Sequence, residues 1–223
     1  MLPRISSIVG ESKEKTEKLL SKSTELSICM SCAVGFGIAA IARVFVPLFF
    51  GEGYEKCVNL LVLFVPVLFV KSLSNVVDQQ YLIPAKCDNQ YTLAVTGGAI
   101  VNLICNGLLI PQLGSVGATL GTLMAELSVL IVSAHCAKKE IRFFRMFSRY
   151  SYYLLLGLIM FIAVRFFDSY SHIERSFIRL ILMIMIGGGV YSLLCLTVWL
   201  KVKEKSVFGS ILISLSKKGA IRK

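Results

Sequence analysis

The stretch that most restricts the fold is residues 91–136, in which two apolar runs of about 20 residues flank a short corner with the sequence PQLGSVG. A helix of about 20 apolar residues crosses a hydrocarbon core of about 30 Å. Polar side chains interrupt this surface at Asn102 and Asn106 in the first run and at Glu126 in the second. Because polar groups inside a membrane face the bundle interior or water, we expect a membrane hairpin whose polar side faces other helices or a wet cavity.

Composition supports a membrane-embedded chain rather than a water-soluble enzyme. Of the 223 residues, 56% are hydrophobic and 17% are charged, whereas soluble domains carry about 25% charged residues. The formal net charge of +11 would favour nucleic acid as a partner of a soluble protein. In an apolar chain, Lys and Arg instead collect in the cytoplasmic loops. The expected partner is therefore the lipid bilayer, and no nucleic acid.

Six apolar runs give an all-α, polytopic membrane helix bundle of about six transmembrane helices. Outside the hairpin they cover about residues 26–50, 58–77, 152–167 and 178–200. The expected organisation is the end of a preceding helix and an amphipathic linker (1–25), a four-helix membrane core (26–136), a basic interfacial segment (137–150), an additional transmembrane pair (151–200) and a basic tail (201–223).

The distribution of basic residues predicts the orientation. Six spans place both chain ends on one side of the membrane, and 18 of the 24 Lys and Arg residues fall in the segments of that side. Because basic loops stay in the cytoplasm, both termini are expected to be cytoplasmic. The segment 137–149 interleaves Lys and Arg with Phe and Met, and we expect it to lie as a helix against anionic lipid headgroups.

The second run carries the least expected charge. Lys71 lies too deep to be a flanking residue, and an ammonium group there costs about 3 kcal/mol on insertion scales. Asn75, Asp78 and Gln79 follow at steps of three and four residues, on the same helix face. This face is expected to point into a cavity. Arg43 either snorkels to the interface or faces the same substrate path.

Small residues begin the second helix of the hairpin, at Gly114, Gly117, Gly121 and Ala125. This spacing favours close helix packing over a phosphate loop, since no Gly-Lys-Ser/Thr ending follows. The seven cysteines are spread singly and are expected to pack as small hydrophobes. We predict no catalytic residues, no metal site and no cofactor.

Four segments carry a resemblance: MLPRISSIVGESKEK, PLFFGEGYEKC, LSNVVDQQYLIP and VNLICNGLLIPQLGSVGATLGTLMAE. They resemble the C-terminal half of a bacterial oligosaccharide (O-antigen) flippase. This is the polysaccharide transporter branch of the multidrug/oligosaccharidyl-lipid/polysaccharide exporter superfamily. The match covers about residues 1–140, and residues 151–200 fit the extra helix pair of fourteen-helix members.

The resemblance implies two six-helix bundles around a central cavity, with alternating access. The first four runs would then be the last four helices of the second bundle, and the chain is expected to be a C-terminal fragment whose missing helices are supplied elsewhere. The implied activity is translocation of lipid-linked oligosaccharide in the bacterial cytoplasmic membrane, not an enzymatic reaction. Lys71 is the phosphate candidate, Asn75, Gln79, Asn102 and Asn106 are the sugar-facing candidates, and Glu126 either couples to protons or pairs with Lys71.

Three alternatives stay open. A drug or cation exporter of the same superfamily would favour acidic cavity residues and an apolar pocket. A membrane-embedded glycosyltransferase would need clustered acidic or His groups at one membrane face, whereas Asp88, Glu140, Asp168 and Glu174 are scattered. A scaffold role, as a non-transporting fragment, is the third. For each candidate side chain, helix–helix hydrogen bonding competes with a substrate role.

Overall fold

The computed structural model describes residues 13–138, 143–171 and 176–202, of which 92% are helical, with no strand in these ranges. In chain order the elements are α2 (Lys13–Phe50), α3 (Lys56–Val77), the π-helical turn η1 (Asp78–Leu82), α4 (Asp88–Leu113), α5 (Ser115–Ala137), α6 (Phe143–Tyr150), α7 (Tyr152–Tyr170) and α8 (Ser176–Val202). Within these described ranges, six helices are long and apolar enough to cross a membrane. The predicted all-α, polytopic bundle is confirmed.

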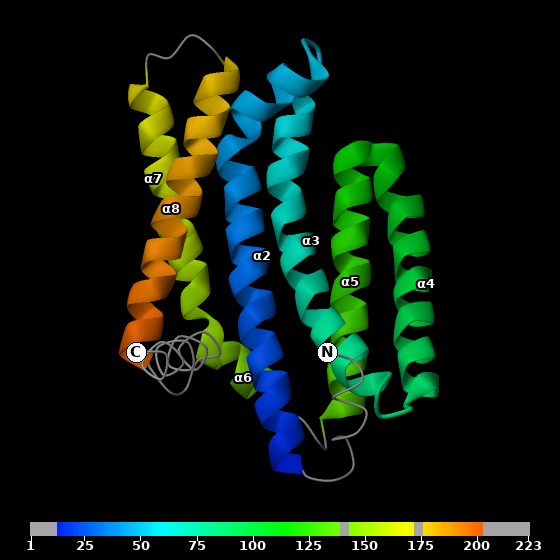
Figure 1. Cartoon of the computed structure of the whole chain (residues 1–223). Helices are drawn as coiled ribbons and strands as arrows, with labels where there is room; N and C mark the ends of the chain where they lie inside the picture. The colour runs from blue at the N-terminus through cyan, green and yellow to red at the C-terminus, as the bar shows by residue number, and fades with distance from the viewer. Residues whose placement is uncertain (1–12, 139–142, 172–175, 203–223) are drawn as a thin grey trace, which may run out of the picture.

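The helices form a row rather than a ring; consecutive spanning helices run in opposite directions, whereas the neighbours α3 and α5 run parallel, as do α2 and α7 (Figure 1). Figure 1 shows α7 and α8 at one edge, α2 and α3 in the middle, and α5 followed by α4 at the other edge. The closest neighbours are α4 with α5, α5 with α3, α3 with α2, and α2 with α7 and α8. The start of α2 and the end of α8 lie at the same end of the bundle (Figure 1).

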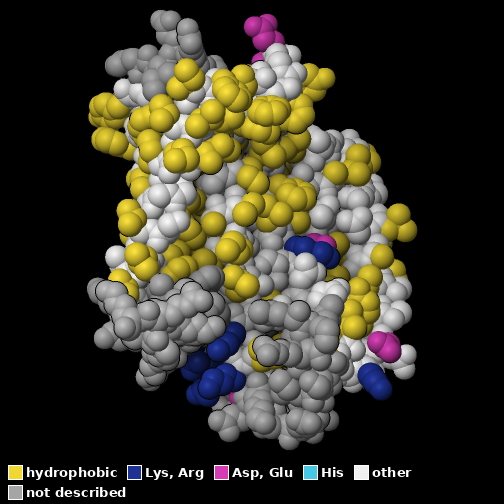
Figure 2. All heavy atoms as spheres, viewed as in Figure 1, with side chains coloured by type: hydrophobic (Ala, Val, Ile, Leu, Met, Phe, Trp, Pro, Cys, Tyr) yellow, Lys and Arg dark blue, Asp and Glu magenta, His cyan; other side chains and the backbone are white. Residues whose placement is uncertain are grey.

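The outer surface of the bundle is apolar over most of its height. Large hydrophobic side chains such as Leu103, Phe166 and Met185 are 64–75% exposed, and Figure 2 shows yellow side chains spread over the helices in this view. Water-soluble monomers rarely expose contiguous apolar surface of this extent. Together with the six spanning helices, this surface makes the chain a multi-pass membrane protein.

The expected linker before residue 26 is part of the first spanning helix. α2 continues without interruption from Lys13 to Phe50, and Leu20, Thr24 and Glu25 are no more than 1% exposed. Leu20 and Thr24, four positions apart, share a face of the helix, and the burial of all three side chains shows that this part of α2 packs against other helices. Residues 13–24 are therefore continuous with the helix that follows them. The boundary placed after residue 25 falls inside α2.

The hairpin of α4 and α5 is held by the small residues that the sequence singled out. A methyl group added at Gly117 would meet the backbone carbonyl of Leu109, and one added at Gly121 would meet the side chain of Asn106. Gly117, Gly121 and Ala125 are buried. The predicted packing face is therefore the α4–α5 interface. The corner itself is Gly114, whose φ of +56° belongs to the region that favours glycine.

The basic segment is described in part. α6 covers residues 143–150, while residues 139–142, with Lys139 and Arg142, lie outside the described residues. The same holds for the expected N-terminal residues 1–12 and for tail residues 203–223.

Candidate functional site: a polar cleft inside the bundle

Six of the seven candidate side chains line one cleft of about 780 Å³ between α3–η1, α4 and α5. We call it the polar cleft. Its polar lining consists of Lys71, Asn75, Asp78, Gln79, Asn102, Asn106, Thr122 and Glu126. The helical spacing of the first four and the hairpin geometry of the others bring these side chains to one place from three elements.

The α3 side of the polar cleft follows from sequence spacing. Lys71, Asn75 and Gln79 are exposed to the cleft, whereas Asp78 is 4% exposed. Val76 and Val77, on the opposite face, are buried against other helices. Lys71 lies eleven residues before the end of η1, which is about 16 Å along a helix. Its charge is therefore far from either end of the span.

Lys71 and Glu126 form an ion pair across the polar cleft. Nζ of Lys71 lies 3.0 Å from Oε1 of Glu126, and the two side chains are 49% and 17% exposed. Figure 2 shows an adjoining blue and magenta patch at mid-height, away from the charges at the ends of the bundle. The pairing offsets part of the cost of burying each charge. It also matches one of the two roles that the sequence left open for Glu126.

The asparagines of α4 hydrogen-bond to each other. Nδ2 of Asn106 donates to Oδ1 of Asn102 at 2.9 Å. The same Asn106 side chain lies against Gly121, where a larger residue would displace it. Helix–helix packing and the polar lining of the cleft therefore depend on the same two positions, Asn106 and Gly121.

Several acceptor atoms at the cleft have no partner. Asn106 Oδ1, Asp78 Oδ1 and Glu126 Oε2 are buried atoms that accept no hydrogen bond within the part of the chain that the structure describes. An unpaired buried acceptor costs about 1–3 kcal/mol. The cleft therefore presents unused hydrogen-bonding capacity to water, a ligand or a further helix.

Arg43 is not brought to this site. It lies on α2, is exposed, and is absent from the cleft lining. It stands seven residues before the end of α2 at Phe50. This position fits the snorkelling alternative better than the substrate path.

Two further polar clusters lie outside the cleft, and sequence reasoning did not find them. Tyr153 donates to Glu25 Oε1 at 3.0 Å, and Trp199 Nε1 donates to the Tyr153 hydroxyl at 2.8 Å. This first cluster joins α2, α7 and α8.

In the second cluster, Asp168 accepts from Arg165 at 2.9 Å and from Arg179 Nε at 2.8 Å. It joins α7 to α8. Neither cluster borders the polar cleft.

A second cavity, of about 580 Å³, lies between α2, α7 and α8 and differs in chemistry. We call it the apolar groove, because its lining is mainly apolar and includes the buried side chains of Met160, Val164 and Met183. Within the described residues, no group of three or more His, Cys, Asp and Glu side chains is arranged to hold a metal ion.

The fold and the polar cleft define a multi-pass α-helical membrane protein with a polar cleft inside its membrane-spanning part. Comparisons of the chain with protein-family models, with curated proteins and with solved structures found no match.

Proposed function

We propose that the chain forms part of a transporter that flips lipid-linked oligosaccharide across the bacterial cytoplasmic membrane for surface polysaccharide biosynthesis. The observation that carries the proposal is the convergence of Lys71, Glu126 and four amide side chains on one cleft inside the spanning helices. The resemblance of residues 1–140 to oligosaccharide flippases supplies the substrate class.

The chemistry of such a substrate fits the polar cleft. A diphosphate and a sugar cannot enter hydrocarbon without replacing their lost water, because burial of an unpaired ion costs tens of kcal/mol. Asn75, Gln79 and Asn102 offer amide donors and acceptors for sugar hydroxyls. Lys71 is half-exposed, so a phosphate would compete with Glu126 for its ammonium group. The lipid tail would stay in the bilayer.

The same proposal includes a second wall for the cleft. α4 packs chiefly against α5, and the cleft retains unpaired acceptors in the described chain. Further transmembrane helices, in the same polypeptide or in another chain, would cover this side and supply hydrogen-bond donors.

We also propose that both termini face the cytoplasm. The support is the excess of Lys and Arg in segments on the side of the chain ends. Cysteine labelling in intact cells tests this orientation, with each tested thiol retained singly. Cys57, at the opposite end, should react with an impermeant maleimide from outside, and Cys87 should react only after permeabilisation. The reverse pattern would exclude the orientation.

Deletion of the gene in its host tests the transport proposal. Surface polysaccharide should disappear while lipid-linked oligosaccharide accumulates in the membrane, and a plasmid copy should restore export. A plasmid copy that carries Lys71→Ala should restore less export than one that carries Lys56→Ala. The second variant is the matched control, because Lys56 is exposed and lies outside the polar cleft. Unchanged surface polysaccharide in the deletion strain would contradict the proposal.

A drug or cation exporter is the second candidate. The observation that favours it is the pair of carboxylates, Asp78 and Glu126, in the cleft lining. The same deletion strain distinguishes the two candidates, because loss of an exporter should raise the accumulation of a cationic dye and leave the glycan at the surface.

A further inference from the structure

The short helix α6 is fixed to the bundle by its aromatic side. The ring centroid of Phe147 lies 6.0 Å from that of Phe69 on α3. Tyr150 is 4% exposed, and its hydroxyl lies 2.8 Å from Ser21 Oγ on α2. α6 therefore keeps a defined position at the end of the bundle where α2 begins (Figure 1).

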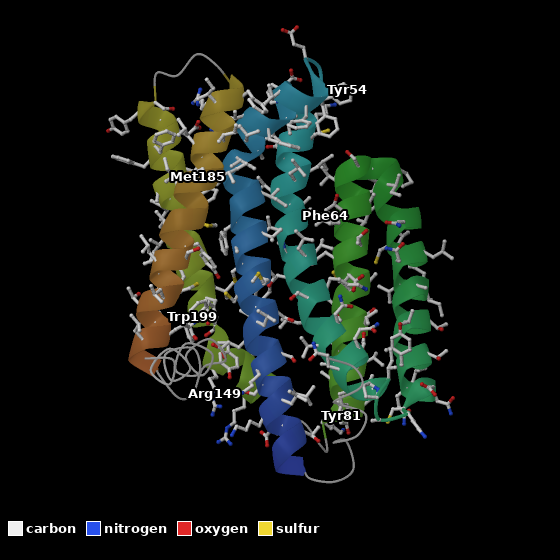
Figure 3. All side chains as sticks on the ribbon, viewed as in Figure 1. Tyr54, Phe64, Tyr81, Arg149, Met185 and Trp199 are labelled. Atoms are coloured by element: carbon white, nitrogen blue, oxygen red, sulfur yellow. The ribbon has the colours of Figure 1, made fainter. Side chains whose placement is uncertain are left out.

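The exposed side of α6 is basic. Arg145 and Arg149 are exposed, and Figure 3 shows Arg149 beside the first turns of α2. Because Ser21 contacts Tyr150, the neighbours of Ser21 on α2 stand at the junction of α2 with α6. Those neighbours include Lys18, one turn earlier, and Lys22. We call these four residues, Lys18, Lys22, Arg145 and Arg149, the α2–α6 basic patch.

Among the residues that the structure describes, no ion pair involves the four cations of this patch. The ion pairs of the described chain lie elsewhere, at Lys71–Glu126 and around Asp168. Glu17, next to Lys18, and Glu25, three residues after Lys22, are acidic residues of α2 close to the patch along the helix. Four cations against these two carboxylates leave the patch with a net positive charge, and Figure 2 shows blue side chains near the lower end of the view.

The surroundings of the patch are those of a membrane interface. Trp199 lies at the same end of the bundle as Arg149 (Figure 3) and is hydrogen-bonded to Tyr153, one turn beyond Tyr150. Tyr and Trp are enriched at the headgroup level of membranes. Leu155, Ile159 and Ile162, spaced along one face of α7, are 59%, 40% and 57% exposed, and we call them the apolar flank of α7. A ligand of this surface therefore meets cations at one end and apolar side chains at the other.

We propose that the α2–α6 basic patch binds the phosphodiester headgroup of an anionic phospholipid, with the acyl chains against the apolar flank of α7. Guanidinium groups donate paired hydrogen bonds to phosphate oxygens, and α6 holds two of them at fixed positions. A soluble phosphate or a nucleic acid would leave the apolar flank uncovered. The patch shares no residue with the polar cleft, so this proposal is independent of the transport function.

Trp199 is the single tryptophan of the chain, and it reports on lipids near the patch. The experiment uses the purified full chain in phosphatidylcholine bilayers that contain a small fraction of brominated lipid, which quenches tryptophan emission on contact. Brominated phosphatidylglycerol should quench Trp199 more strongly than brominated phosphatidylcholine at the same fraction. The difference should shrink as salt is added, because the attraction is electrostatic. Equal quenching by the two lipids at low salt would overturn the proposal.

Charge-removing variants locate the effect. Arg149→Gln should lower the relative affinity for phosphatidylglycerol about fivefold, and Arg145→Gln by a similar factor. Arg149→Lys should retain most of the preference. Lys86→Gln is the matched control, since Lys86 is exposed in the turn before α4, at the same end as α6 but outside the patch. An equal loss with Lys86→Gln would show a general surface charge and overturn the site.

Folding is monitored separately in every variant. The helical circular dichroism and the Trp199 emission maximum without brominated lipid should match those of the unmodified chain. If Arg149→Gln changes either signal, the salt dependence and the comparison of the two brominated lipids in the unmodified chain still decide the proposal.

Discussion

The two sides of the bundle bury their carboxyl and amide groups in different ways. On the side of α2, α7 and α8, the buried carboxylates Glu25 and Asp168 each accept hydrogen bonds from side chains of other positions. On the side of α3, α4 and α5, Asp78, Asn106 and Glu126 each keep a buried oxygen without a partner among the described residues. The cavities of the two sides differ as well: the apolar groove lies between α2, α7 and α8, and the polar cleft lies between α3–η1, α4 and α5.

This difference separates two uses of polar residues in a membrane protein. A fully hydrogen-bonded carboxylate between helices fixes their relative position, because separating the helices would leave a charge unpaired in a medium of low dielectric constant. An unpaired acceptor beside an open cleft holds no helix in place. It is available to a ligand, to water or to another helix. We therefore expect the first side to determine stability and the second to determine function.

The largest expected effect is at Asp168. Asp168→Ala should destabilise the chain by about 3 kcal/mol, because Arg165 and Arg179 would lose their shared partner while remaining mostly buried. Thermal unfolding of the purified chain in detergent measures it. The stability of Asp168→Asn, which keeps one acceptor oxygen, should lie between that of the unmodified chain and that of Asp168→Ala. A loss for Asp168→Ala no larger than that for Glu126→Gln would remove the distinction between the two sides.

The α4–α5 interface lies on the cleft side but should still contribute to stability, because it is built from close contact with the backbone rather than from hydrogen bonds. Gly117→Ala would press a methyl group onto the carbonyl of Leu109 and should cost about 2 kcal/mol. Gly107→Ala is the control, since a methyl group there meets nothing within 4 Å. That change should be neutral or stabilise the helix by up to about 1 kcal/mol. Equal melting temperatures for the two variants would show that α4 and α5 pack less closely.

A smaller loss is expected at the cluster that joins α2 to α7 and α8. Tyr153→Phe removes the donor to Glu25 and the acceptor of Trp199, and should cost about 1–2 kcal/mol. The emission of Trp199 should also shift, since its indole nitrogen loses this partner. Tyr170→Phe serves as the control, because Tyr170 is 69% exposed and should change neither property. If the emission of Trp199 shifts while the free energy of unfolding stays the same, Tyr153 affects only the surroundings of Trp199 and does not stabilise the helix contacts.

Sequence reasoning worked where a property depends on residues close together along the chain. The six spans follow from the length of apolar runs, and Lys71, Asn75 and Gln79 meet in one cleft because helical spacing places them on one face. The small residues of α5 predicted its contact with α4 for the same reason.

Properties that depend on distant partners were missed. Glu25 sits at the polar edge of an apolar run, where charges are ordinary, and its donor Tyr153 is 128 positions away. Asp168 likewise stands at the end of a run, so its pairing with Arg179 on the next helix was not visible in its neighbours. The uninterrupted course of α2 through residue 25 depends on the same burial by helices far along the chain.

The smallest expected loss of stability is at Lys71. Its side chain is 49% exposed in the polar cleft, and half-exposed ion pairs contribute about 0–1 kcal/mol. Lys71→Ala should therefore lower the amount of protein in the membrane only slightly. If Lys71 binds an anionic group of the substrate, the same change should reduce glycan export far more than it reduces protein level. Lys71→Arg should retain part of the export, because the positive charge remains while its geometry changes.

Glu126 provides the second half of this test. A Lys71→Ala, Glu126→Gln double variant removes both charges of the pair, and its stability compared with the single variants gives their coupling. If the pair serves only to hold α3 and α5 together, each single variant should lose protein level, the double variant should recover it, and export should follow protein level throughout. Export that remains low in the double variant at normal protein level would instead assign Lys71 to the substrate. If export follows protein level, the Lys71–Glu126 pair stabilises the bundle as Asp168 does. The difference between the two sides of the bundle would then depend only on the amide side chains and the unpaired acceptors of the polar cleft.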